Sequence, residues 1–158
     1  MQLNRRVVIA FAITLASSTG LGGCAISRTL GWNQSGDAAR LSPAEKAKLT
    51  SEAKAHWAKR LDRAELEKAL SKWEQIARSN PSDFESQAML ARGYYLLADS
   101  HLPDSQMDDK KKFWETGTSW GEKALATNAA FKKKVQDEQA LIEDSLDTLT
   151  KNEVPAIY

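Results

Sequence analysis

The chain contains a single cysteine, Cys24, which is the residue most clearly placed to undergo chemistry. The residues Leu21-Gly22-Gly23-Cys24 resemble the bacterial lipobox, in which an aliphatic residue and two small residues precede a lipidated cysteine. Small side chains suit an extended backbone in a peptidase cleft, and only a thiol forms the thioether to the lipid. The motif predicts cleavage after Gly23 and lipidation of Cys24. The alternative is a chance cysteine behind an ordinary secretory signal.

The residues before Cys24 have the order of a signal peptide. Arg5 and Arg6 are followed by an apolar run from Val7 to Ala16 and then by small residues. That run is about ten residues long, whereas a transmembrane helix needs about 20. We therefore expect residues 1–23 to be a lipoprotein signal peptide rather than a membrane-spanning anchor.

A second pattern, Gly117-Thr118-Ser119-Trp120-Gly121, matches the G-x-S-x-G motif around a catalytic serine. That serine needs a strand before it and, in chain order, a histidine after it. Residues 110–114 favour a helix, and both histidines, His56 and His101, precede Ser119. Two glycines four residues apart more simply predict close packing of one helix face. We expect no catalytic residues and no enzyme activity, and a hydrolase is the weakest alternative.

Neither the histidines nor the acidic residues predict a metal or cofactor site. His56 and His101 have no partner at the spacing of metal ligands. Asp104, Asp108 and Asp109 lack the central glycine and closing glutamate of a calcium loop. We expect these aspartates to cap the following helix near its positive N-terminal end.

Charge argues against nucleic acid as a partner. The chain has 22 Lys and Arg against 21 Asp and Glu, and loss of Arg5 and Arg6 with the signal leaves it near neutral. The runs Lys110–Lys112 and Lys132–Lys134 predict solvated helix faces, with anionic lipid headgroups as the alternative partner. The aromatic residues are expected mainly to pack inside the domain, and contact with an apolar ligand or peptide is the alternative. Tyr94 and Tyr95 are adjacent and cannot share one helix face, so we expect one of them to point outward or into a groove. These aromatic residues are Trp57, Trp73, Trp114, Trp120, Tyr94 and Tyr95.

Beyond a flexible tether at residues 24–41, the pattern is helical throughout and predicts an all-α fold. Ser42-Pro43-Ala44-Glu45 is a helix start, with an apolar stripe continuing to Leu61. Asn80-Pro81 ends a second helix. A second capping box that starts at Ser82, Ser82-Asp83-Phe84-Glu85, opens a third helix to about Ser100, and Pro103 precedes a fourth reaching about Ala126. No segment alternates with the period of a strand. The apolar residues expected to be buried in the second helix are Leu66, Ala69, Leu70, Trp73, Ile76 and Ala77, and those of a fifth helix are Phe131, Val135, Ile142, Leu146 and Leu149.

The spacing of small and bulky residues is typical of a tetratricopeptide repeat, although the array is irregular. Gly117, Gly121 and Ala124 could fill the close-packing positions of the next unit, but they come about 14 residues later than the repeat requires. The alternative is a plain helical bundle. The residues in phase are Ala69, Trp73, Ile76, Pro81, Leu90, Ala91 and Tyr94.

An ordered set of segments over residues 53–158 resembles the TatT family, the repeat-containing lipoproteins associated with tripartite ATP-independent periplasmic (TRAP) transporters. No one motif carries the resemblance, which lies in the order of the set. The segments are His56-Trp57, Arg60, Asp62, Asn80-Pro81, residues 91–99, Gly117, Trp120, Ala124-Leu125 and residues 154–158.

The resemblance implies a divergent tetratricopeptide-like domain over residues 42–158, with about five helices and the start of a sixth near Asn152. It also implies a periplasmic lipoprotein that forms homo-oligomers, binds a TRAP substrate-binding protein and passes on an apolar ligand. Family members continue with further helices, so the domain is expected to be C-terminally incomplete. The residue directly after Cys24 is Ala25 and not Asp, which favours the outer over the inner membrane. A scaffold for envelope assembly is the alternative function.

Overall fold

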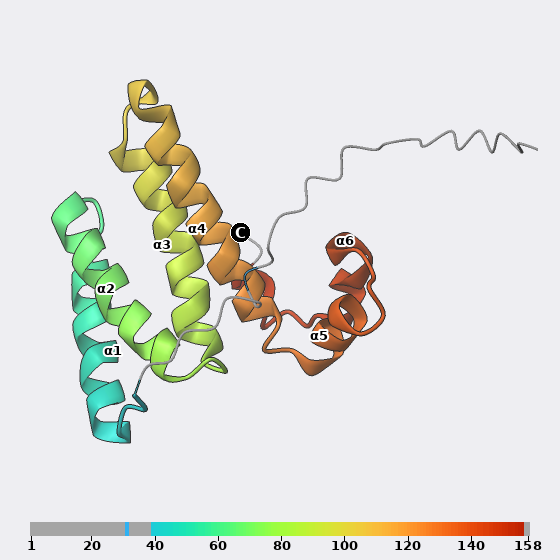
Figure 1. Ribbon diagram of the computed structural model, residues 1–158. Helices are drawn as coiled ribbons and strands as arrows, with labels where there is room; N and C mark the ends of the chain where they lie inside the picture. The colour runs from blue at the N-terminus through green and yellow to red at the C-terminus, as the bar shows by residue number, and fades with distance from the viewer. Residues whose placement is uncertain (1–30, 32–38, 157–158) are drawn as a thin grey trace, which may run out of the picture.

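The computed structural model describes Gly31 and residues 39–156, and within them it is helical with no strand (Figure 1). The predicted all-α fold is confirmed. Cys24, the predicted signal peptide and most of the predicted tether lie outside the described residues. The elements are α1 (Pro43–Trp57), α2 (Arg63–Ser79), α3 (Phe84–His101), η2 (Asp104–Gln106), α4 (Met107–Leu125), α5 (Ala129–Gln136), α6 (Ile142–Ser145), η3 (Leu146–Thr148) and η4 (Val154–Ala156).

Helix α1 begins where the sequence predicts but ends earlier. Glu45 donates its backbone N–H to the Ser42 hydroxyl, and the Glu45 carboxylate accepts from the Ser42 backbone, which is a reciprocal capping box. The helix ends at Trp57, so Leu61 does not extend its apolar stripe and is 89% exposed. The reason is that Asp62 closes a turn onto the Lys59 carbonyl and caps α2 with its side chain.

Helix α2 supplies much of the apolar core. All six of its residues that were predicted to be buried are buried. Trp73 is 1% exposed and meets Trp57 of α1 edge to face, with ring centroids 5.3 Å apart. The helix ends at Ser79, as expected from Pro81 two residues after it, because the residue before a proline disfavours the helical conformation.

Helix α3 begins one residue later than the sequence suggests. Asp83, not Ser82, is the N-cap, and its carboxylate accepts a hydrogen bond from the Ser86 backbone N–H at 3.1 Å. Asp83 also forms an ion pair with Lys46 of α1. The longer, charged side chain therefore caps the helix and ties it to α1. The helix ends at His101, before Pro103, as predicted.

The helices pack in chain order, α1 on α2, α2 on α3 and α3 on α4, with α3 between its two neighbours (Figure 1). Two glycines permit this packing. A Cβ atom on Gly93 would lie 2.4 Å from the Leu70 side chain of α2, and one on Gly117 would lie 3.0 Å from the Ala91 carbonyl oxygen of α3. The α2–α3 and α3–α4 contacts therefore both depend on a missing side chain.

The predicted fifth helix is divided in two. Helix α5 is capped by Asn128 and ends at Gln136, and α6 begins only at Ile142. In the turn between them Gln139 has a φ of 54°, a left-handed conformation that a continuous helix does not contain. Phe131 and Val135 are buried in a second apolar cluster with the end of α4, as expected, whereas Leu146 is 39% exposed.

The predicted start of a sixth helix near Asn152 is a single 3-10 turn, η4. This turn packs against α3 and α4, and Ala156 is 9% exposed there. A Cβ atom on Gly121 would lie 3.0 Å from the Ala156 carbonyl oxygen. The two glycines of α4 thus allow two other elements to pack closely against the helix: α3 at Gly117 and the C-terminal turn at Gly121.

Gly117→Val should destabilise the protein by about 1–3 kcal/mol, the usual cost of overpacking a tight contact. Valine has a helix propensity at least as good as that of glycine, so propensity alone predicts no loss. Urea unfolding measures the difference, and Glu115→Val, at an exposed position of α4, is the control for β-branching. Equal stability of Gly117→Val and wild type would contradict the close α3–α4 contact.

Candidate functional site

The G-x-S-x-G pattern lies in the middle of helix α4, not at a strand-to-helix turn. Gly117 faces Ala91 of α3, and Gly121 faces Ala156 of the C-terminal turn. The sequence argument for close packing of these glycines is confirmed. The structural context that the catalytic motif requires, a strand before the serine, does not occur in the described part of the chain.

The same segment of α4 contacts the N-terminal linker, which the sequence argument missed. Gly31 is buried, and its backbone N–H donates a 2.6 Å hydrogen bond to the carboxylate of Glu122, a side chain that is itself buried. A Cβ atom on Gly31 would lie 2.1 Å from the Ser119 carbonyl oxygen. The predicted flexible tether is therefore held against the domain at this residue.

The two histidines lie near the α1–α2 turn. His56 Nδ1 is 2.8 Å from Glu65 of α2, and Glu65 also accepts a 2.7 Å bond from Lys68. The hydrogen bond from Lys68, followed by that from His56, lowers the pKa of Glu65 from 4.5 to about 2. His101, at the end of α3, lies 3.0 Å from the Arg60 carbonyl oxygen. These contacts join α1, α2 and α3 at one end of the domain.

No group of three or more His, Cys, Asp or Glu side chains in the described residues could hold a metal ion. Of the three aspartates expected at the start of α4, Asp108 and Asp109 do lie near its N-terminal end, but none caps the helix with its side chain, contrary to prediction. Gln106 is the N-cap and makes no capping side-chain hydrogen bond, while Asp108 and Asp109 lie in the first turn. Asp104 begins η2 and pairs instead with Lys110, which lowers the pKa of Asp104.

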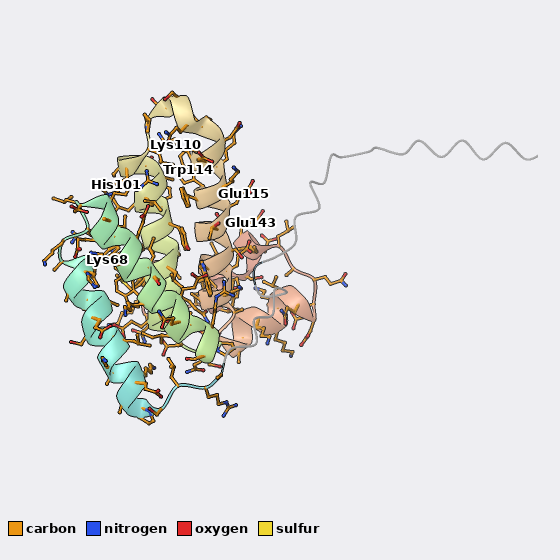
Figure 2. The ribbon with its side chains drawn as sticks, turned by 60° about the vertical axis from the view of Figure 1, so that its left-hand side comes forward. Lys68, His101, Lys110, Trp114, Glu115 and Glu143 are labelled. Atoms are coloured by element: carbon orange, nitrogen blue, oxygen red, sulfur yellow. The ribbon has the colours of Figure 1, made fainter. Side chains whose placement is uncertain are left out.

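Lys110 is the clearest correction to the predicted solvated face. Its side chain is only 8% exposed, and its ammonium lies 2.7 Å from Asp104 and 6.0 Å from the centre of the Trp114 ring. Figure 2 shows Lys110 and Trp114 together toward one end of α4. Lys111 and Lys112 are exposed, as predicted.

The second lysine run is also divided. Lys132 and Lys133 are exposed, as predicted for a solvated face. Lys134 is half-buried and donates hydrogen bonds to the Asp144 carbonyl and the Asp147 carboxylate. It therefore fastens α5 to the segment that follows, so only part of this run is free for a lipid surface.

Most of the aromatic residues serve packing. Trp73 and Trp120 are buried, and Tyr94 stacks on Phe113 with ring centroids 6.0 Å apart. Burial raises the pKa of Tyr94. Tyr95 is 59% exposed, which confirms that one of the two adjacent tyrosines points outward. Among the described residues, Tyr95 is thus the aromatic side chain most open to a partner.

An open hollow of about 630 Å³ lies along α1 and reaches the first turn of α3. Its two lysines are paired, Lys46 with Asp83 and Lys54 with Glu85 at 2.9 Å. The surface is therefore close to neutral. Its lining residues are Pro43, Lys46, Ala47, Thr50, Ser51, Lys54 and Glu85.

Comparison with protein families, curated proteins and solved structures found no match. The resemblance to the TatT family therefore remains a prediction from the residues. Within the described residues, none of the helices has the length and apolar character needed to cross a membrane.

Lys110→Ala should lower stability by about 1–2 kcal/mol, because it removes a packed alkyl chain together with the partner of Asp104. Lys111→Ala is the matched control: it removes the same side chain from the same turn of α4, at an exposed position. Its effect should stay within about 0.5 kcal/mol. Urea unfolding of both variants decides the matter, and equal losses would show that Lys110 is solvated.

Glu65 should stabilise the fold in a pH-dependent way. Its folded pKa, about 2, lies below the ordinary value of 4.5. The unfolded chain therefore takes up the proton first as pH falls, and the stabilisation present above about pH 4.5 declines toward about pH 2. In urea unfolding, wild type should exceed Glu65→Gln most at pH 5, and the difference should shrink at pH 3. A difference independent of pH would exclude the charged interaction.

Proposed function

We propose that this protein is a lipid-anchored interaction module on the periplasmic side of a bacterial membrane, serving TRAP-type solute uptake. In this role it binds a periplasmic substrate-binding protein and an apolar ligand. The observation that carries the proposal is the lipobox-like sequence Leu21–Cys24, followed by an all-α domain. The resemblance to TatT lipoproteins supplies the transport system and its receptor.

The geometry of the domain supports a binding role. Stacked helix pairs create extended surfaces that repeat proteins use to bind partners. The hollow along α1 and the exposed Tyr95 on α3 are two surfaces open to a partner. Because its lysines are paired with acidic residues, the hollow is near neutral and suits a partner protein surface with few charges in its centre.

An envelope-assembly scaffold is the second candidate function. The hollow is broad and open, and an open surface suits an extended protein segment as well as a small ligand. Both candidates need the same anchor and the same helical domain, so they differ only in the partner. The partner must therefore be identified directly.

Cys24→Ser should move the protein from the membrane fraction to the soluble periplasmic fraction, because a hydroxyl cannot carry the thioether-linked lipid. Fractionation and intact-mass measurement check this. Gly36→Ser, also in the segment before α1, is the control and should remain in the membrane. Continued tight association of Cys24→Ser with the membrane would place the anchor elsewhere.

A pull-down of full-length protein from its own periplasm tests the transport role. Recovery of a solute receptor, with a co-purifying apolar ligand in the mass spectrum, is expected. Tyr95→Ala should weaken recovery of the receptor more than Leu61→Ala, a change at an exposed apolar residue in the α1–α2 turn. Recovery of envelope-assembly proteins alone would favour the scaffold and reject the transport role.

A further inference from the structure

The contact between Gly31 and α4 has the features of a specific docking site. A backbone N–H bound to a carboxylate is a charge-assisted hydrogen bond, which is stronger than a neutral one. Glu122, the acceptor, is 5% exposed, so this bond lies inside the protein. The donor and acceptor are separated by 91 positions in the sequence.

Sterics restrict this position to glycine. A Cβ atom on residue 31 would lie 2.1 Å from the Ser119 carbonyl oxygen and 2.8 Å from the Ser119 Cα and carbonyl carbon. All three are backbone atoms of a helix and cannot move aside as a flexible side chain could. Gly31 thus combines a buried polar partner with a close backbone approach, two independent reasons for a defined position.

We infer that the linker is docked to α4 through Gly31, and that this contact shortens the tether between the lipid and the domain. Gly31 lies seven positions after Cys24, a reach of about 25 Å at most, whereas the span from Cys24 to Ser42 would reach about 60 Å. The shortened reach rests on the proposed lipidation of Cys24. The docking itself does not.

Docking also orients the domain. Helices α1 to α4 lie in a row (Figure 1). Gly31 contacts α4, at one end of the row, while the open hollow lies along α1, at the other end. A domain attached to the membrane through α4 presents the hollow away from its attachment point. The contact therefore limits the height of the module and places the point of attachment at the end of the row opposite the hollow.

Amide hydrogen exchange measured by NMR on the full chain, labelled with ¹⁵N-glycine and held in detergent, tests the docking. The chain has eight glycines, and the signal lost in Gly31→Ala identifies the Gly31 amide. Glu122→Ala should accelerate its exchange about ten- to hundredfold, because the amide loses a buried charged acceptor. Glu122→Gln retains the side-chain shape and a weaker acceptor. The exchange rate of the Gly31 amide in this variant should therefore lie between the rates in wild type and in Glu122→Ala.

The amides of Gly93 and Gly117, which lie within α3 and α4, report whether Glu122→Ala retains the fold. If the domain were lost, their exchange would accelerate too, and the Glu122→Gln result would decide. Docking is overturned if the Gly31 amide exchanges equally fast in wild type and in folded Glu122 variants.

Neutron reflectometry of the lipidated protein on a supported bilayer tests the reach. Gly31→Ala should let the protein layer extend up to about 35 Å farther from the membrane, and Gly36→Ala, the matched linker control, should not. Equal extension for both variants and wild type would reject the shortened tether. Release of the protein by Cys24→Ser concerns the anchor alone, so failure of the anchor and failure of the docking give different results.

Discussion

The close approach of α3 to both of its neighbours is the constraint on which the rest of the structure depends. At Gly93 the α3 backbone leaves room for Leu70 of α2, and at Gly117 of α4 the missing side chain leaves room for the Ala91 carbonyl. Because α3 is held from both sides, Leu90 and Leu97 are buried in one core with Trp73. Larger side chains at the glycines would separate the helices and open that core.

Short-range signals allowed much of the fold to be predicted from the sequence. The Ser42 capping box, the apolar stripe of α2 and the Asn80-Pro81 stop each act within a few residues, so their effects can be read locally. The failures are long-range or involve competing caps. Leu61 does not continue the apolar stripe of α1 because Asp62 already caps α2. Lys110 is buried because the turn η2 places Asp104 within ion-pair distance of it. A run of three lysines contains no sign of that return.

The candidate site shows the same division. The spacing of Gly117 and Gly121 predicted close packing, and the structure adds the partners: a helix for the first and the C-terminal turn for the second. The contact of Gly31 with Glu122 could not be predicted, since a lone glycine in a polar segment is typical of a flexible linker. The burial of Glu122 on α4 would have indicated a buried partner, but that burial becomes known only after the helices have been packed together.

One short region of α4 therefore holds three other parts of the protein together. Residues 117–122 contact α3, the C-terminal turn and the linker, so a change in any one of these contacts affects the surface that the others share. A lipid on Cys24 would by itself only confine the domain to a layer near the membrane. If Cys24 carries a lipid as proposed, attachment at α4 would favour one orientation, because the row of helices from α4 to α1 would then have an attached end and a free end. A partner arriving from the side away from the attachment would then meet the free end, where the hollow along α1 is open.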